Sequence, residues 1–177
     1  MNRRLEFQLL LGGCLCLIVV PIVRADDSRL ITEGVVEAPV EEVWRGFTTK
    51  AGMESWMVAH ADIDLKLGGK MRTHYDPKGM LGDAKSIEHT ILSFEPERMF
   101  SMKVTKHPDT FPFPAAIQSV WTVLYFDPTP DKKTRVRIVM IGYGDDEESQ
   151  KMRKFFDAGN QYTLKRMQQR FDPANGK

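Results

Sequence analysis

The sequence predicts an α+β fold, in which one long C-terminal helix covers an antiparallel sheet of about seven strands. Three observations point to it. Between residues 29 and 143, apolar and polar side chains alternate in successive short segments, as in strands that bury one face. Hairpin-length links join most of these segments, which favours antiparallel pairing. Residues 149–171 lack proline and carry apolar side chains at helical spacing, so a long helix should cover the sheet.

The composition is typical of one globular domain. Of the 177 residues, 42% are hydrophobic and 28% are charged, which excludes the disordered and multi-span membrane classes. The 25 Lys and Arg against 24 Asp and Glu give a formal net charge of +1, so we expect no nucleic-acid partner. The two cysteines, Cys14 and Cys16, are too close together to build a disulfide framework.

The first 25 residues are typical of an export signal. Arg3 and Arg4 precede the uncharged run 9–23, and Ala25 ends a cleavage site of short residues. A helix that spans a membrane needs about 20 apolar residues, and the uncharged run 9–23 is shorter than that. We therefore expect cleavage near Ala25 and an exported domain, periplasmic or extracellular, at residues 26–177. Two alternatives stay open: an uncleaved N-terminal anchor, which would be the only contact with a membrane, and lipidation at Cys14.

The first strand and two short helices are expected in the segment after the leader. Residues 29–38 are rich in β-branched side chains and predict the strand. Pro39 suits the first turn of a helix, and apolar residues recur at helical spacing from Val40 to Phe47. Residues 53–57 predict the second helix.

Six more strands are expected after these helices. Gly68 and Gly69 are typical of a two-residue hairpin turn between the first two of them. In the second, His74 shares a face with Lys70 and Arg72, so we expect its ring to be solvated. The predicted ranges are 62–67, 70–75, 85–94, 99–105, 117–126 and 135–143.

The last helix is expected at residues 149–171. The acidic run 145–148 precedes it, where negative charges suit the positive end of a helix, and Ser149 or an earlier Asp can cap it. Its apolar stripe includes Phe156 and Asn160.

Several segments in the same order resemble the SRPBCC superfamily, which includes the START and birch-pollen-allergen-like proteins. More narrowly they resemble its branch named after the homologue of the heat-shock-protein-90 ATPase activator. The resemblance covers about residues 30–171, and it rests on the segments 37–44, 64–70, 94–99, 134–136 and 142–143, with Trp56 after the first.

The resemblance implies a helix-grip fold: a curved antiparallel sheet wrapped on a long helix, with a cavity between them. Members often have Gly-Trp on the last helix where this chain has Gly159 and Asn160. Such cavities are mostly apolar and hold a few polar groups. The candidate ligand-binding residues are Trp56, Met71, His89, Trp121, Tyr125, Met140, Phe155, Gly159 and Tyr162.

Residues 106–114 form an unusual loop, because three prolines forbid a central strand while Phe111 and Phe113 stand among them. Large apolar rings in a loop are unfavourable in water unless they pack over another apolar surface. We expect a lid over the cavity or a contact for a protein partner; the alternative is a loop packed on its own core.

Three functions follow from these observations. The first is an exported protein that binds a small apolar or amphipathic ligand. The second is a protein-interaction module, as the resemblance to chaperone-activating domains implies, and the third is an enzyme of the cyclase or hydrolase type. No catalytic residue is assigned, because no spacing selects an acid–base pair. The four histidines lack metal-ligand spacing, so neither a metal nor another cofactor is expected.

Overall fold

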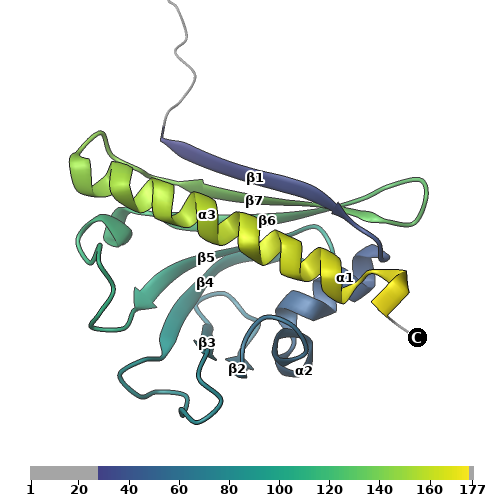
Figure 1. Cartoon of the computed structure of the whole chain (residues 1–177), viewed down its shortest axis with the longest axis horizontal. Helices are drawn as coiled ribbons and strands as arrows, with labels where there is room; N and C mark the ends of the chain where they lie inside the picture. Colours follow the sequence, from purple (N-terminus) through teal and green to yellow (C-terminus); the bar gives the residue numbers. More distant parts are fainter. Residues whose placement is uncertain (1–27, 176–177) are drawn as a thin grey trace, which may run out of the picture.

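The computed structural model describes residues 28–175 and has the expected α+β architecture (Figure 1). The expected leader, residues 1–25, lies outside the described residues. Within them, no helix is long and apolar enough to span a bilayer. The elements are β1 (Arg29–Val36), α1 (Val40–Thr48), α2 (Lys50–Glu54), β2 (His60–Ile63), β3 (Lys70–His74), β4 (Ile87–Glu95), β5 (Met99–Lys106), η1 (Ala116–Ser119), β6 (Trp121–Pro128), β7 (Thr134–Ile141), α3 (Glu147–Arg170) and η2 (Pro173–Asn175).

The described strands form one seven-stranded sheet in the order β1-β7-β6-β5-β4-β3-β2, and every neighbouring pair is antiparallel. Strands β2 to β7 follow one another as a meander, so each of them pairs with the next strand in the sequence. Strand β1 crosses to the far side and pairs with β7. The two edge strands are therefore β1 and β2, and the predicted number of about seven strands is confirmed.

The structure departs from the predicted element boundaries most clearly at three places. Residues 64–69 form a compact turn instead of a strand and a two-residue hairpin: Lys66 N–H donates to Asp64 O at 2.8 Å, and Gly68 has a φ of 73°. Helix α2 begins three residues early because Thr49 Oγ1 accepts the N–H of Gly52. Residues 117–119 belong to the 3₁₀ helix η1, so β6 begins only at Trp121.

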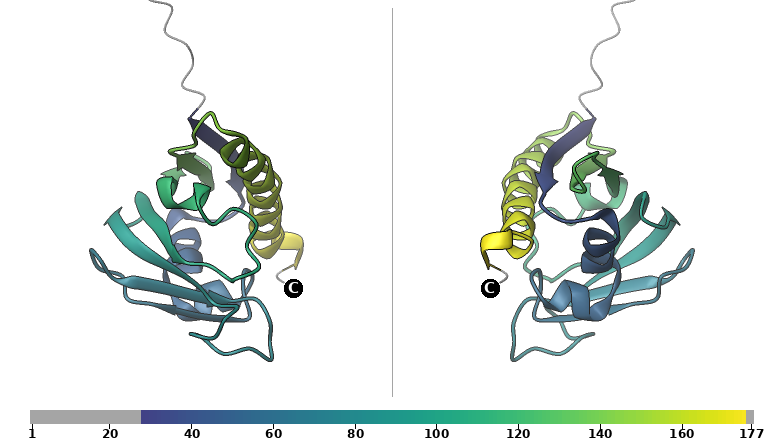
Figure 2. Two further views of the ribbon diagram at one scale, coloured as in Figure 1. Left: turned by 90° about the vertical axis from the view of Figure 1, so that its left-hand side faces the viewer. Right: turned by 90° about the vertical axis from the view of Figure 1, so that its right-hand side faces the viewer.

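Helix α3 lies along one edge of the sheet (Figure 2). Asp146 caps its N-terminus, with Oδ1 accepting the Ser149 N–H at 2.9 Å. The helix packs mainly against β1, and Gly34 allows this approach, because a Cβ there would lie 2.9 Å from Leu164 Cδ2. Gln168 Nε2 donates to Val35 O at 2.9 Å.

The interior is divided into two apolar clusters. The larger joins α1, α2 and the sheet to the C-terminal half of α3 through Leu164 and Met167. The smaller gathers around η1, Met140 and Met152, which lies in the N-terminal half of α3. Helix α3 packs closely on the sheet only at β1. The two clusters therefore stay separate between the helix and the other strands.

Replacing Gly34 by valine should destabilise the fold, because the added methyl groups would meet Leu164 and Gln168. We expect a loss of roughly 1–3 kcal/mol in the free energy of unfolding, the usual cost of overpacking. Urea denaturation followed by circular dichroism measures it. Glu33→Val, at the neighbouring exposed position of β1, is the matched control. Equal stabilities of the two variants would show that α3 does not depend on this contact.

Candidate functional site

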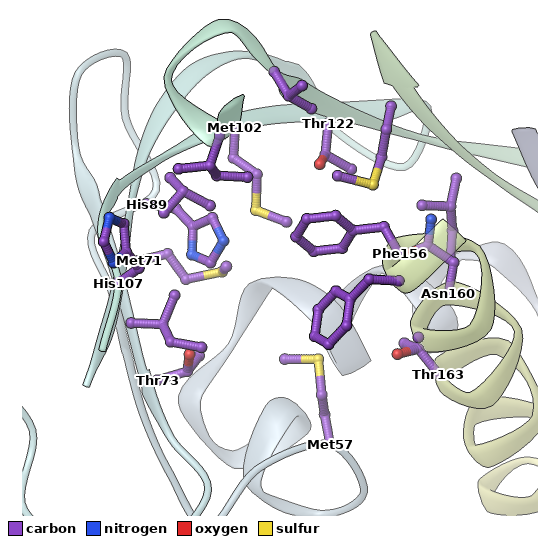
Figure 3. A pocket seen from close by; sticks show the side chains of 18 of the residues that line it. Met57, Met71, Thr73, His89, Met102, His107, Thr122, Phe156, Asn160 and Thr163 are labelled. Carbon is purple, nitrogen blue, oxygen red and sulfur yellow. The ribbon is translucent and has the colours of Figure 1, made fainter. Parts of the chain in front are cut away.

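A cavity of about 740 Å³ lies between the sheet and α3. Members of both apolar clusters line it, which places it where the clusters fail to merge. Figure 3 shows the two walls: Met71 and His89 project from the sheet, and Phe156, Asn160 and Thr163 belong to α3. The volume lies within the usual range for small-molecule sites.

The wall is made mostly of aromatic rings and methionine side chains. Rings offer large apolar surface with preferred stacking geometry, and methionine adapts its shape to irregular neighbours. Such a lining suits an apolar body better than a compact polar solute. Its principal members are Phe47, Trp56, Met57, Met71, Phe100, Met102, Phe111, Met140, Phe155 and Phe156.

Two polar atoms in this wall have no hydrogen-bond partner among the described residues. One is Nδ1 of His89, on β4, and the other is Nδ2 of Asn160, on α3; both atoms are buried. Buried polar groups in proteins are nearly always paired. Because both residues line the cavity, a small rotation of either side chain would bring its unpaired nitrogen to a hydrogen-bond partner inside the cavity.

Burial also fixes the charge of His89. Loss of solvent disfavours the imidazolium and lowers the pKa of His89 from 6.5 to about 4. The ring is therefore neutral at pH 7. A neutral imidazole offers one donor and one acceptor, so His89 can bond a ligand oxygen or a ligand N–H without introducing charge.

Eight of the nine predicted ligand-binding residues line the cavity, namely Trp56, Met71, His89, Trp121, Met140, Phe155, Gly159 and Tyr162. The exception is Tyr125. Its neighbours on β6, Thr122 and Leu124, line the cavity, and alternation turns Tyr125 to the opposite face. There the Arg137 guanidinium lies 4.7 Å from the centre of its ring. That the other eight bind a ligand stays a prediction.

The proline-rich loop connects β5 to η1, and its rings pack against α3. The Phe111 ring lies 6.2 Å from that of Phe156 and lines the cavity. Phe113 does not line it; its ring packs 5.7 Å from Phe155, beside the smaller apolar cluster. Phe111 thus lies in the cavity wall, and both rings pack against the smaller apolar cluster, as in the alternative of a loop packed on its own core; a lid role stays a prediction.

Sequence reasoning missed several lining residues, among them Met57, Met102, Asn160, Thr163 and Arg166. The sequence does single out Asn160, because its amide stands inside the otherwise apolar stripe of an amphipathic helix, where a polar side chain is unusual. The others had none, since their exposure to the cavity depends on how far α3 stands from the sheet.

Residues 37–172 match the family described as activator of Hsp90 ATPase homolog 1-like protein. The chain belongs to this family. The match covers α1 to the end of α3 and so includes every element that lines the cavity. The fold is consistent with a domain for ligand binding or for protein interaction. A comparison with curated proteins found no match.

Solved structures share the fold of this family member at low sequence identity. Protein MLL2253 from Mesorhizobium loti is 19% identical, with a TM-score of 0.64 over 81% of this chain and 96% of its own. The Aha1 dimer from Colwellia psychrerythraea is 11% identical, with a TM-score of 0.62 over 82% and 96%. CalU16 from Micromonospora echinospora is 18% identical, with a TM-score of 0.59 over 82% and 77%.

The cavity contains no evident catalytic pair. No Asp or Glu lines it, and no described group is hydrogen-bonded to His89 Nδ1. His107 also lines the cavity, and its Nδ1 lies 3.0 Å from the Pro108 carbonyl oxygen, but no acidic side chain of the described lining stands beside either histidine to orient it as a base. Within residues 28–175, no three His, Cys, Asp or Glu side chains are placed to hold a metal ion.

His74 is buried rather than solvated, which corrects the sequence expectation. Its exposed fraction is 1%, because the segment 76–86 folds over it. Nδ1 accepts the Asp76 N–H at 3.1 Å, and Nε2 donates to Asp83 Oδ1 at 3.0 Å. The pKa of Asp83 is lowered to about 2, chiefly because its carboxylate accepts the Met80 N–H, and to a smaller extent because it accepts the Lys85 N–H and lies beside His74. The strand pattern gave no sign of this long-range cover.

Gly79→Ala should destabilise this segment, because a Cβ at residue 79 would lie 1.9 Å from Cε1 of the His74 ring. Both nitrogens of that ring are bonded, so it cannot move cheaply. We expect a loss of roughly 1–3 kcal/mol in thermal or urea unfolding. Lys78→Ala, at an exposed neighbouring position, should change little; a similar effect of both variants would contradict the packing described.

The buried neutral His89 should make the fold less stable in mild acid. Unfolded His89 takes up a proton near pH 6.5, whereas the folded residue does so only near pH 4. Its contribution is therefore complete above pH 6.5 and is lost as the pH falls toward 4, by at most about 3 kcal/mol. Urea unfolding of the wild type and His89→Met at pH 7 and pH 4.5 measures it. An identical pH dependence of the two proteins would contradict it.

Proposed function

We propose that this protein is an exported carrier that binds a small apolar or amphipathic molecule in the cavity between the sheet and α3. The observation that carries the proposal is the pair of unpaired polar atoms, His89 Nδ1 and Asn160 Nδ2, inside an otherwise apolar wall. An accidental packing defect would be small and lined by hydrocarbon. This cavity is ligand-sized and has bonding groups on two sides.

The energetics favour occupancy. A buried polar group without a partner costs roughly 1–3 kcal/mol, and aromatic surface facing water forgoes about 25 cal/mol for each Å². A ligand that covers the rings and bonds either polar atom recovers part of both. The wall is held by two packed clusters and a 24-residue helix, so the site is largely formed before the ligand arrives.

Export is a separate part of the proposal and rests on the sequence of the leader. We expect the chain isolated from its own host to begin at Asp26, outside the cytoplasm, and N-terminal sequencing of the fractionated protein measures this. A chain that still begins at Met1 would favour the uncleaved anchor if it is found in the membrane fraction. The same chain in the cytosol would contradict export.

Native mass spectrometry tests whether a ligand is bound. The protein purified from its own host should have a mass above that of its polypeptide, and the excess should disappear on denaturation. The dye N-phenyl-1-naphthylamine, which is apolar and uncharged, should also bind the emptied protein and gain fluorescence. A bare polypeptide that does not take up the dye would contradict the proposal.

Filling the cavity should abolish dye binding without unfolding the protein. A Cβ at Gly159 would meet no atom within 4 Å, so Gly159→Trp can place its ring in the space between helix and sheet. We expect at least tenfold weaker dye binding and a stability within about 1 kcal/mol of the wild type, since glycine is itself a poor helix former. Ala158→Trp, at an exposed helix position outside the lining, is the matched control and should bind normally.

A further inference from the structure

The polar residues of the α3 wall follow one another toward the solvent. Asn160, Thr163 and Arg166 are spaced three residues apart, so they lie on neighbouring turns of the helix, and all three line the cavity. Asn160 Nδ2 is buried, while Arg166 is exposed. At about 1.5 Å per residue, some 9 Å of helix separates the inner group from the outer one. The three side chains offer an amide N–H, a hydroxyl and a guanidinium, and each can donate a hydrogen bond.

The lining has donors and one permanent positive charge but no negative charge. Among the lining residues in the described part of the chain, Arg166 is the only Lys or Arg, and none is Asp or Glu. Asp157, the acidic residue nearest in sequence to Asn160, is outside the lining, and its Oδ1 accepts a hydrogen bond from Gln161 Nε2 at 3.2 Å. A cationic ligand would therefore find no counter-ion in the described cavity, whereas an anionic one finds a guanidinium at its mouth.

Arg166 also lacks an ion-pair partner within residues 28–175. The described salt bridges engage basic side chains elsewhere in the fold, such as Arg72 with Asp62 and Lys151 with Glu147, and none includes Arg166. A guanidinium forms paired, directional bonds to carboxylate and similar anions. Arg166 is thus free to bond a ligand that enters beside it.

We propose that the ligand is an anionic amphiphile, with its apolar body among the rings and methionines and its acid group at Arg166. Asn160 and Thr163 donate hydrogen bonds to oxygen atoms that lie further along the molecule. Neutral His89 closes the inner end without adding charge. This inference rests on the proposed binding function and deepens it by naming the class of ligand.

Three compounds with the same tail test the proposal: dodecanoate and dodecylamine, each below its micelle concentration at pH 7.5, and dodecanol below its solubility limit. Their displacement of N-phenyl-1-naphthylamine from the wild-type protein gives their relative affinities. We expect dodecanoate to bind about tenfold more tightly than dodecylamine, with dodecanol between them. Such a tenfold ratio corresponds to about 1.4 kcal/mol, which a partly shielded ion pair can supply.

Two variants assign the preference to these residues. Arg166→Gln should reduce the ratio of dodecanoate to dodecylamine affinity from about tenfold to about twofold, and Asn160→Asp, which places a carboxylate in the wall, should invert it. Lys165→Gln removes the same charge from a neighbouring residue outside the cavity lining and should leave the ratio unchanged. An effect of Lys165→Gln equal to that of Arg166→Gln would reduce the preference to general surface charge and overturn the proposal.

The outcomes separate this inference from the binding function. If the dye binds but the three compounds displace it equally, or the amine displaces it best, the cavity binds ligands and the anionic class is wrong. If the dye does not bind and none of the compounds is bound in calorimetry, both proposals fail. A tenfold preference for the acid that survives Arg166→Gln would also overturn the assigned contact.

Discussion

The close contact between α3 and the edge strand β1 is the constraint on which the rest of the structure depends. Gly34 removes the side chain that would hold the helix away, and Leu164 occupies the space. Two side chains of the helix then donate hydrogen bonds to backbone carbonyls of the strand: Arg153 Nη2 donates to Arg29 O at 3.0 Å, and Gln168 Nε2 donates to Val35 O. These bonds also cover a sheet edge that would otherwise be open to pairing with another chain.

A helix fixed at one edge cannot also touch the far strands of a curved sheet (Figure 2). The larger apolar cluster fills the space near the C-terminal end of α3, and the smaller one fills the space near its N-terminal end. Between them the side chains of both walls stop short of each other. The cavity is thus a consequence of where the helix is attached, and its size depends on the residues at Gly34 and Gly159, where larger side chains would move the helix or fill the gap.

The chemistry of the cavity follows from which side chains face this gap. Rings and methionines give it an apolar wall, while His89 and Asn160 retain atoms that nothing in the described chain bonds. His89 is neutral because burial lowers its pKa. Arg166 provides the one permanent charge of the lining, at the solvent side. These properties suit the binding of a largely apolar molecule that has a few polar atoms.

Local patterns in the sequence predicted the fold well, because alternation, proline positions and helix caps act over a few residues. The seven strands and the long helix could be assigned in this way, and alternation also placed Met71 on the cavity side. Tyr125 was chosen for its residue type and not for its place in the alternation, and its neighbours Thr122 and Leu124 line the cavity in its place. The burial of His74 could not be predicted, because its cover comes from the segment 76–86 folding back.

The most direct test of the account is a high-resolution crystal structure of the protein purified from its own host without added ligand. The account predicts continuous density of a non-protein molecule between the sheet and α3, within hydrogen-bond distance of Asn160 Nδ2 or His89 Nδ1. A cavity closed by the chain's own side chains, with Phe155 and Phe156 packed against Met71 and both polar atoms bonded within the protein, would contradict it.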